Sequence, residues 1–232
     1  MKKYFKLFFI SALIFITFTT SVSASIFIKE TDDGIRYSVT EDNFVVIEGY
    51  NVTSLSLKIP AEIDGHAVKE IKSLALYGNQ YINSLEIAEG VEIIGDGAFS
   101  YCKNLISVKL PSTVKSIPDS AFKGCSSLTT LTLAEGIERI ENGAFEDCKI
   151  LGNVKIPKTV TYIGNGSFYG CEKLIFNCGS NEYAKAYAAE NFISTSYFSG
   201  LSAVVIWTIA ITAIGAVVLF VILPKIRNKK VK

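Results

Sequence analysis

The sequence predicts a repeat solenoid: a β-rich stack with about 23 residues per coil, an N-terminal β-hairpin cap, a C-terminal helical cap and one C-terminal transmembrane helix. Two observations carry this prediction. Cysteine recurs every 23 residues at four positions, in register with columns of alanine or serine, phenylalanine and leucine. Both ends of the chain are much more apolar than the region 25–200 between them. A fixed period of this length is typical of coils that stack on one another.

The first 24 residues (1–24) are predicted to form a cleaved signal peptide. Three lysines precede an uncharged apolar run at 7–18, and small residues at 22–24 suit a cleavage site. The alternative is an uncleaved anchor helix. That alternative is disfavoured because the run is much shorter than the roughly 20 apolar residues that a membrane span requires.

Residues 25–54 are predicted to form the N-terminal β cap. Two short stretches, Tyr37–Val39 and Phe44–Ile47, flank the turn-prone segment Thr40–Asn43 and therefore indicate a hairpin. A cap is expected at each end of the stack, because the outermost coil has an apolar side that no neighbouring coil covers.

Residues 55–176 are predicted to be the repeat region. Each regular unit opens with apolar residues on either side of a non-apolar one, which is typical of a half-buried strand. These triplets are Leu85–Ile87, Val108–Leu110, Leu131–Leu133 and Val154–Ile156. One irregular unit precedes these four and spaces Ile59 and Ile87 by 28 residues instead of 23. We assign its extra residues to a loop at 61–67.

Two columns of the repeat are predicted to form the structural core. They are Phe99, Phe122, Phe145 and Phe168, and Cys102, Cys125, Cys148 and Cys171. A free cysteine behaves as a small buried hydrophobe. One cysteine per coil does not match the clustered spacing of a zinc site, so no metal is expected. A disulfide between Cys171 and Cys178 is the alternative that the sequence leaves open.

Residues 177–192 are predicted to form the C-terminal cap, and 193–200 a linker to the membrane. The cap contains an alanine-rich stretch, Tyr183–Glu190, that favours a helix and is followed by Asn191 as a stop.

The segment 201–223 is predicted to be a transmembrane helix. It contains no charged residue, and a helix of this length reaches about 34 Å, enough to cross the hydrocarbon core. The basic tail 224–232 is expected in the cytoplasm, which places the repeat domain outside the cell as part of a single-pass membrane protein. A lipid-anchor signal is the alternative, and the basic tail argues against it.

The charge and the histidine content exclude several functions. The region 25–200 holds 15 Lys and Arg against 22 Asp and Glu, so 15 − 22 = −7, and no nucleic acid partner is expected because phosphates require a basic patch. His66 is the sole histidine, and we expect it to be exposed in the inserted loop. No nucleophile or carboxylate is fixed beside it by spacing, so the sequence predicts neither catalytic residues nor a cofactor.

The unit VKLPSTVKSIPDSAFKGCSSLTT at 108–130 resembles the BspA-like leucine-rich repeat family of bacterial and protist surface proteins, and the likeness covers about 44–192. The resemblance implies that 55–176 are leucine-rich repeats. It also implies display on the cell surface and adhesion or protein binding, without catalytic residues.

The exposed middle residue of each predicted strand defines the candidate ligand-binding face, to which we add His66. The row is Lys58, Glu86, Lys109, Thr132 and Lys155. Its expected partner is an extracellular protein or glycan. The row has a second interpretation, because opposite charges on adjacent strands also stabilise strand pairing, by about 0.2–1 kcal/mol. A different function stays open as well, that of a membrane-proximal structural scaffold of the cell envelope.

Asn51 and Asn165 each begin a glycosylation sequon, which has meaning only in a eukaryotic secretory route. Asn165 shares a turn column with Asp96, Asp119 and Asn142. We therefore predict a mainly structural role for Asn165.

Overall fold

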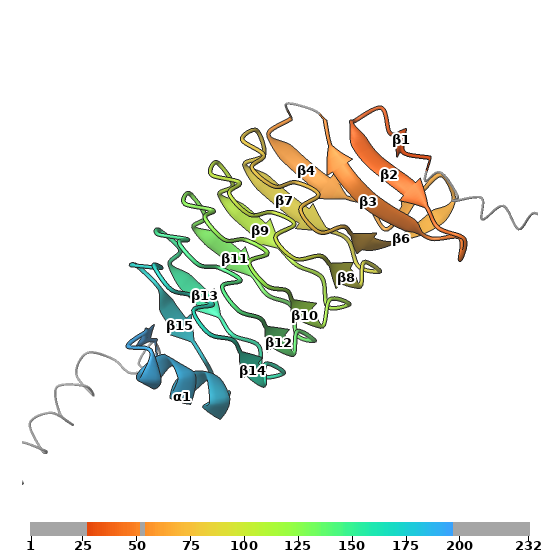
Figure 1. Cartoon of the computed structure of the whole chain (residues 1–232). Helices are drawn as coiled ribbons and strands as arrows, with labels where there is room; N and C mark the ends of the chain where they lie inside the picture. The colour runs from red at the N-terminus through yellow and green to blue at the C-terminus, as the bar shows by residue number, and fades with distance from the viewer. Residues whose placement is uncertain (1–26, 52–53, 197–232) are drawn as a thin grey trace, which may run out of the picture.

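The computed structural model describes residues 27–51 and 54–196. They form an elongated stack of coils whose strands lie side by side (Figure 1). The predicted signal peptide, 1–24, and the predicted membrane span, 201–223, lie outside the described residues. Within the described part of the chain, no helix is long and apolar enough to cross a bilayer.

One side of the stack is a row of parallel strands, which we name the sheet face. Its strands are β4 (Ser56–Ile59), β7 (Ser84–Ile87), β9 (Ser107–Lys109), β11 (Thr130–Thr132), β13 (Asn153–Lys155) and β15 (Ile175–Asn177). They mark six coils in the described residues, one more than the sequence predicts. Parallel pairing joins β4, β7, β9 and β11, and separately joins β13 to β15. β11 and β13 are in contact, but no ladder pairs them in this part of the fold.

A second side of the stack, which we name the second face, is made of parallel strands that are only two residues long after the first. They are β6 (His66–Ile71), β8 (Ile93–Ile94), β10 (Ser116–Ile117), β12 (Arg139–Ile140) and β14 (Tyr162–Ile163). Between most coils the residue after the strand donates its N–H to the previous coil, as Gly95 does to the Ile71 carbonyl (2.7 Å). Pro118 occupies this position after β10 and has no N–H to donate. The described strands β8 and β10 accordingly lie in separate sheets.

The third side of each coil is a series of tight turns, and the phenylalanine column lies just inside it. Phe99, Phe122 and Phe145 are fully buried and Phe168 nearly so. Consecutive rings along the column have centroids 5.2, 5.4 and 5.2 Å apart. Because one side chain repeats at the same place in every coil, the rings form a continuous stack that adds to the hydrophobic core.

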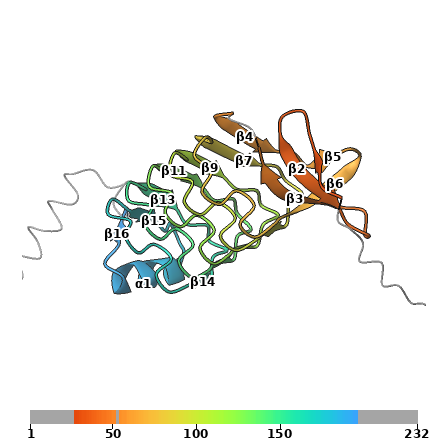
Figure 2. The ribbon, with the colours of Figure 1, turned by 45° about the horizontal axis from the view of Figure 1, so that its top comes forward.

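The N-terminal end of the stack is an antiparallel hairpin, shown beside the first coil in Figure 2. β1 (Lys29–Glu30) pairs with β2 (Ile35–Val39), β2 pairs with β3 (Val45–Tyr50), and β3 continues into the second face by pairing parallel with β6. The hairpin of β2 and β3 lies where the sequence predicts it, and both of these strands are longer than predicted.

The inserted segment 61–67 is not an irregular loop, which corrects the prediction. β5 (Glu62–Ile63) pairs antiparallel with the start of β6. Asp64 and Gly65 connect these strands with φ angles of 54° and 79°. A two-residue turn of this kind favours Asp-Gly, because both residues need a left-handed backbone conformation.

The C-terminal end carries α1 (Glu182–Glu190), close to the predicted helix bounds. The Asn181 side chain accepts a hydrogen bond from the Ala184 N–H (2.9 Å), which satisfies one free amide at the helix start. Asn191 ends the helix. The prediction of a linker over 193–200 is wrong at its start, because Ser194–Thr195 forms β16 and pairs parallel with β15.

Candidate functional site

The sheet face aligns most of the predicted row in a single register. Lys58 pairs with Glu86, Glu86 with Lys109, and Lys109 with Thr132 across the parallel strands. Lys155 has the equivalent place on β13, which contacts β11 without pairing with it. Strand spacing of about 4.8 Å makes this a regular polar row across the coils.

A second polar row on the same face was missed at the sequence level. Ser56, Ser84, Ser107 and Thr130 lie in register, two residues before the charged row, and the Ser84 Oγ donates to the Ser56 Oγ at 2.9 Å. This row could have been predicted from the sequence, because its residues recur once per coil, two positions before the residues of the charged row. A shallow hollow of about 300 Å³ crosses four strands between the two rows.

Ion pairs connect the N-terminal part of the charged row. The Lys109 Nζ donates to a Glu86 carboxylate oxygen at 2.8 Å, and the Lys58 Nζ lies 3.9 Å from the other oxygen. The hydrogen bond from Lys109 and the two nearby positive charges lower the pKa of Glu86. These contacts support the interpretation that the charges help to set the register between coils.

The farther part of the row is paired differently. Lys155 approaches Glu135 at 3.4 Å, and this acid lies after β11 and not on a strand. Thr132 is exposed and uncharged. The sheet face therefore changes along the stack from a paired charge cluster to a more sparsely charged, hydroxyl-bearing region.

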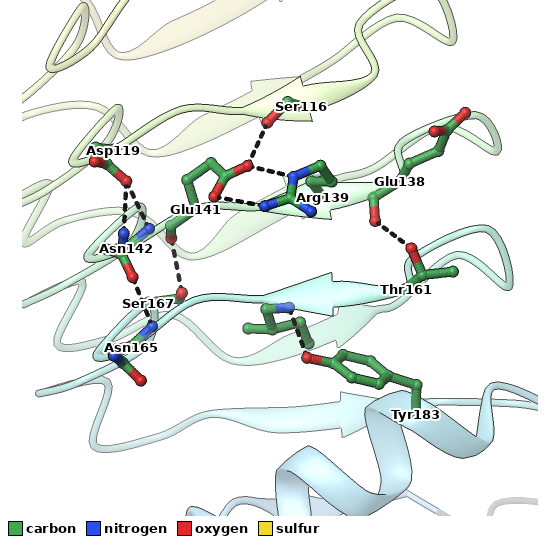
Figure 3. Close-up of polar contacts among 11 residues, drawn as sticks. Ser116, Asp119, Glu138, Arg139, Glu141, Asn142, Thr161, Asn165, Ser167 and Tyr183 are labelled. Atoms are coloured by element: carbon green, nitrogen blue, oxygen red, sulfur yellow. Dashed lines mark hydrogen bonds and ion pairs between the residues drawn. The ribbon is translucent and has the colours of Figure 1, made fainter.

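The second face shows how polar side chains set the turns (Figure 3). The Asp119 Oδ1 accepts hydrogen bonds from the backbone N–H and side-chain amide of Asn142 (2.8 and 3.2 Å), and the Asn142 Oδ1 accepts one from the Asn165 N–H (2.9 Å). This ladder gives Asn165 a structural role, as its column predicts. Beside it, Glu141 accepts two hydrogen bonds from Arg139 (2.6 and 3.3 Å).

The repeat pattern matches a known family over most of the chain. The model of the BspA-type leucine-rich repeat region matches residues 53–203 as six copies. The chain belongs to the BspA-type leucine-rich repeat family. The resemblance predicted from 108–130 is thus confirmed, and the family repeat extends beyond the 55–176 expected for it.

Solved leucine-rich repeat structures resemble this fold. A leucine-rich repeat protein of T. pallidum is 29% identical, with a TM-score of 0.60 over 65% of this chain and 72% of that protein. One from Bacteroides ovatus is also 29% identical, with a TM-score of 0.57 over 63% of this chain and only 40% of its own length. The pneumococcal vaccine antigen PcpA shares the fold at 18% identity (TM-score 0.51; 67% of this chain, 50% of that one). No curated protein sequence matches the chain.

The cysteine column of this leucine-rich repeat is a ladder of free thiols. All five cysteines are unbridged, so Cys171 and Cys178 form no disulfide. Each repeat thiol donates to a backbone carbonyl of the previous coil, as the Cys125 Sγ does to the Phe99 carbonyl at 3.2 Å. The column consists of Cys102, Cys125 and Cys148, which are buried, and Cys171, which is partly exposed.

The thiol ladder is poorly suited to nucleophilic chemistry. Burial raises the pKa of the Cys102 thiol to about 12, and it raises the pKa of Cys125 as well. A hydrogen bond with Cys171, followed by burial, raises the pKa of Cys148. Because the thiolate is the reactive form, Cys102, Cys125 and Cys148 stay protonated and inert near neutral pH.

His66 does not lie where the sequence predicts it. It opens β6 opposite Ile63, is partly buried, and lies on a different sheet from the charged row. Its Nδ1 atom is buried without a hydrogen-bond partner among the described residues. The tight Asp64-Gly65 turn explains the difference, because it draws this residue into a strand. His66 instead borders a hollow of about 680 Å³ on the N-terminal sheet, together with Glu48 and Lys72.

The metal-ligating side chains of the described residues are not gathered into a metal site. In residues 27–51 and 54–196, no three His, Cys, Asp or Glu side chains are grouped to hold a metal ion. Glu48, the buried acid at the N-terminal hollow, is paired with Lys72 at 2.6 Å and accepts a hydrogen bond from Ser38 at 2.9 Å. Glu48 is thus already paired with two side chains of its own fold.

Proposed function

We propose that the protein is a non-catalytic binding or adhesion module, anchored in the membrane and displayed outside the cell, whose sheet face contacts an extracellular protein or glycan. The single observation that carries the proposal is the alignment of a hydroxyl row and a charged row on one exposed parallel sheet. Solenoids of this kind provide extended, rigid surfaces that suit binding.

The two rows favour an extended polar partner. Hydroxyls both donate and accept hydrogen bonds, and on adjacent strands they recur at about 4.8 Å. The hydrogen-bonded ion pair with Glu86 restrains the Lys109 side chain, which reduces the conformational entropy that this side chain loses when a ligand binds. We propose that Ser107, Thr130 and Thr132 make the central contacts and that Lys58, Lys109 and Lys155 border them.

The anchoring part of the proposal rests on the two apolar ends of the chain, 1–24 and 201–223. The described fold ends at Ser196, five residues before the predicted span. Five extended residues reach at most about 18 Å, which would hold the last coil close to the bilayer. We also propose that the β1–β3 strands and α1 act as caps, since they lie at the two ends of the stack.

A binding experiment with matched variants tests the sheet face. The ectodomain 25–200, clustered to increase avidity, is applied to arrays of extracellular proteins and glycans. Lys109→Glu and Thr130→Arg are expected to weaken binding about tenfold or more. Lys115→Glu is the control, because Lys115 is exposed in the same coil but lies just before β10, beside the second face. Equal losses in Lys109→Glu and Lys115→Glu, or no binding to any arrayed molecule, would count against the proposal.

The alternative of a membrane-proximal scaffold is favoured by the short distance between Ser196 and the predicted span. Both functions place the repeats outside the cell, but only the binding module must reach a partner beyond the envelope. Protease treatment of intact cells separates them. Cleavage within 27–196 supports exposure, whereas protection until the envelope is opened supports the scaffold.

A further inference from the structure

A polar hollow lies at the junction between the N-terminal hairpin and the first coil, away from the sheet face. It has a volume of about 390 Å³ and is lined by Tyr50, at the end of β3, by Asn51 and by the turn residues 75–81. None of its described lining residues comes from a sheet-face strand. Its volume lies in the range of small-ligand sites in proteins, about 300–1,000 Å³.

The lining combines aromatic rings with side-chain amides and carries no charge. The rings and amides are those of Tyr50, Tyr77 and Tyr81, and of Asn51, Asn79 and Gln80. No Asp, Glu, Lys, Arg or His is among the described residues that line it. The lining therefore offers aromatic surface and neutral hydrogen-bonding groups.

Several of these groups are free to meet a ligand. Tyr77 is 56% exposed and Tyr81 is 54% exposed. Within the described chain, neither of their hydroxyls nor the Gln80 side-chain amide forms a hydrogen bond. The turn that presents them is fixed, because the Asn79 Oδ1 accepts hydrogen bonds from the N–H groups of Tyr81 (2.9 Å) and Ile82 (3.1 Å).

The Tyr77 ring is held by a neighbour in a strained conformation. Its centroid lies 5.5 Å from that of Tyr101, with the ring planes at 66°. Tyr101 has a φ of 58°, in the left-handed region that Gly78 and Gly124 occupy at the same position of adjacent coils. A Cβ on Gly124 would lie 2.6 Å from the Tyr101 ring, so the next coil leaves room for this ring. Asp147 has a φ of 59° at the same position two coils further on, so the turn conformation recurs along the stack. The aromatic contact with Tyr77 is what distinguishes this coil.

We propose that this hollow, the tyrosine site, binds a neutral oligosaccharide. One side of a pyranose ring presents C–H groups that pack on the apolar face of a tyrosine, while its hydroxyl edge exchanges hydrogen bonds with amides and phenols. Tyr77 and Tyr81 supply the rings, and Gln80 supplies both a donor and an acceptor. Sugars that carry carboxylates or sulfates find no cation in the lining to balance their charge.

The test uses the full-length chain, dissolved in a detergent without a sugar head group so that the detergent does not compete. The probes are the neutral hexasaccharides of N-acetylglucosamine, β-1,4-glucose and α-1,4-glucose, with hexagalacturonate as the charged comparison. Affinity is measured by titration calorimetry and by saturation-transfer NMR. At least one neutral hexasaccharide is expected to bind, and Tyr77→Ala and Tyr81→Ala are each expected to weaken its binding about tenfold or more.

Tyr169 provides the matched control. It lies four repeats from Tyr77 at the same position of the coil and is 73% exposed, so Tyr169→Ala is expected to leave affinity within about twofold. Gln80→Ala tests the hydrogen bonds without removing a ring. The proposal is overturned if no neutral hexasaccharide binds at millimolar concentration, if hexagalacturonate binds more tightly, or if Tyr169→Ala weakens binding as much as Tyr77→Ala.

Discussion

The N-terminal region, 27–82, and the regular coils, 84–174, share one structural frame but use their side chains differently. In the regular coils a column residue usually meets its equivalent in the next coil, as the parallel rings of Phe122 and Phe145 do. In the first coil, Leu76 and Asn79 replace the phenylalanine and the cysteine, and tyrosines nearby face solvent. Where the repeat is regular, side chains are used for contacts between coils. Where the first coil departs from the repeat, side chains stay available to a ligand.

The largest effect should come from breaking a column in the middle of the regular coils. Phe122→Ala removes a fully buried ring stacked between two others and is expected to lower the free energy of unfolding by about 3–5 kcal/mol. Chemical denaturation measures this change. A loss below about 1 kcal/mol would show that the column does not support the stack.

A smaller effect should come from the packing between the first two regular coils. Gly124→Ala places a methyl group against the Tyr101 ring at a left-handed backbone position and is expected to cost about 1–3 kcal/mol. Adding Tyr101→Ala should recover part of that loss. A double-mutant cycle with a coupling energy below about 0.5 kcal/mol would contradict the packing described for this pair.

The N-terminal region should respond to alkaline pH through a contact that no other coil repeats. The Tyr37 hydroxyl donates to the Asp64 carboxylate, which raises the pKa of Tyr37 to about 12. Because this folded-state pKa lies above the ordinary value of 10.0, the contribution is complete below pH 10 and is lost as the pH rises to about 12. Tyrosinate absorbance should show a late-titrating tyrosine that disappears in Tyr37→Phe. Identical titration curves for the unchanged protein and Tyr37→Phe would contradict the raised pKa of Tyr37.

The same hydrogen bond lowers the pKa of Asp64. The Asp64 contribution should therefore be present above the ordinary aspartate pKa and be lost as the pH falls through the lowered value. Asp64→Asn should reduce the dependence of the unfolding midpoint on acidic pH, with Asp42→Asn in the β2–β3 turn as the control. Equal changes in the two variants would argue against a specific role for Asp64.

The smallest effect on stability should come from the sheet face. Glu86→Gln weakens two exposed ion pairs and is expected to cost about 0.2–1 kcal/mol. A thermal melt in low and high salt measures this, since screening should shrink the difference. A loss of several kcal/mol would mean that the row serves mainly the fold and not a ligand.

Most of the repeating features could be predicted from the sequence, whereas several features that occur once could not. The strands, the phenylalanine and cysteine columns and the Asn165 turn follow from one period, because equivalent residues stack on one another. The pairing of Ser194–Thr195 with β15 carries no apolar pattern and depends on the free edge of that strand. The position of His66 depends on a two-residue turn inside an insertion. The hydroxyl row was predictable, since it repeats as regularly as the charged row.

Photocrosslinking in living cells tests the binding role of the sheet face most directly. A photoreactive phenylalanine analogue replaces Thr132 on the sheet face in one variant and Thr161 beside the second face in another, both of which are exposed. We expect a discrete crosslinked partner from position 132 and little or none from position 161. No crosslink from 132, or the same products from both positions, would contradict this role.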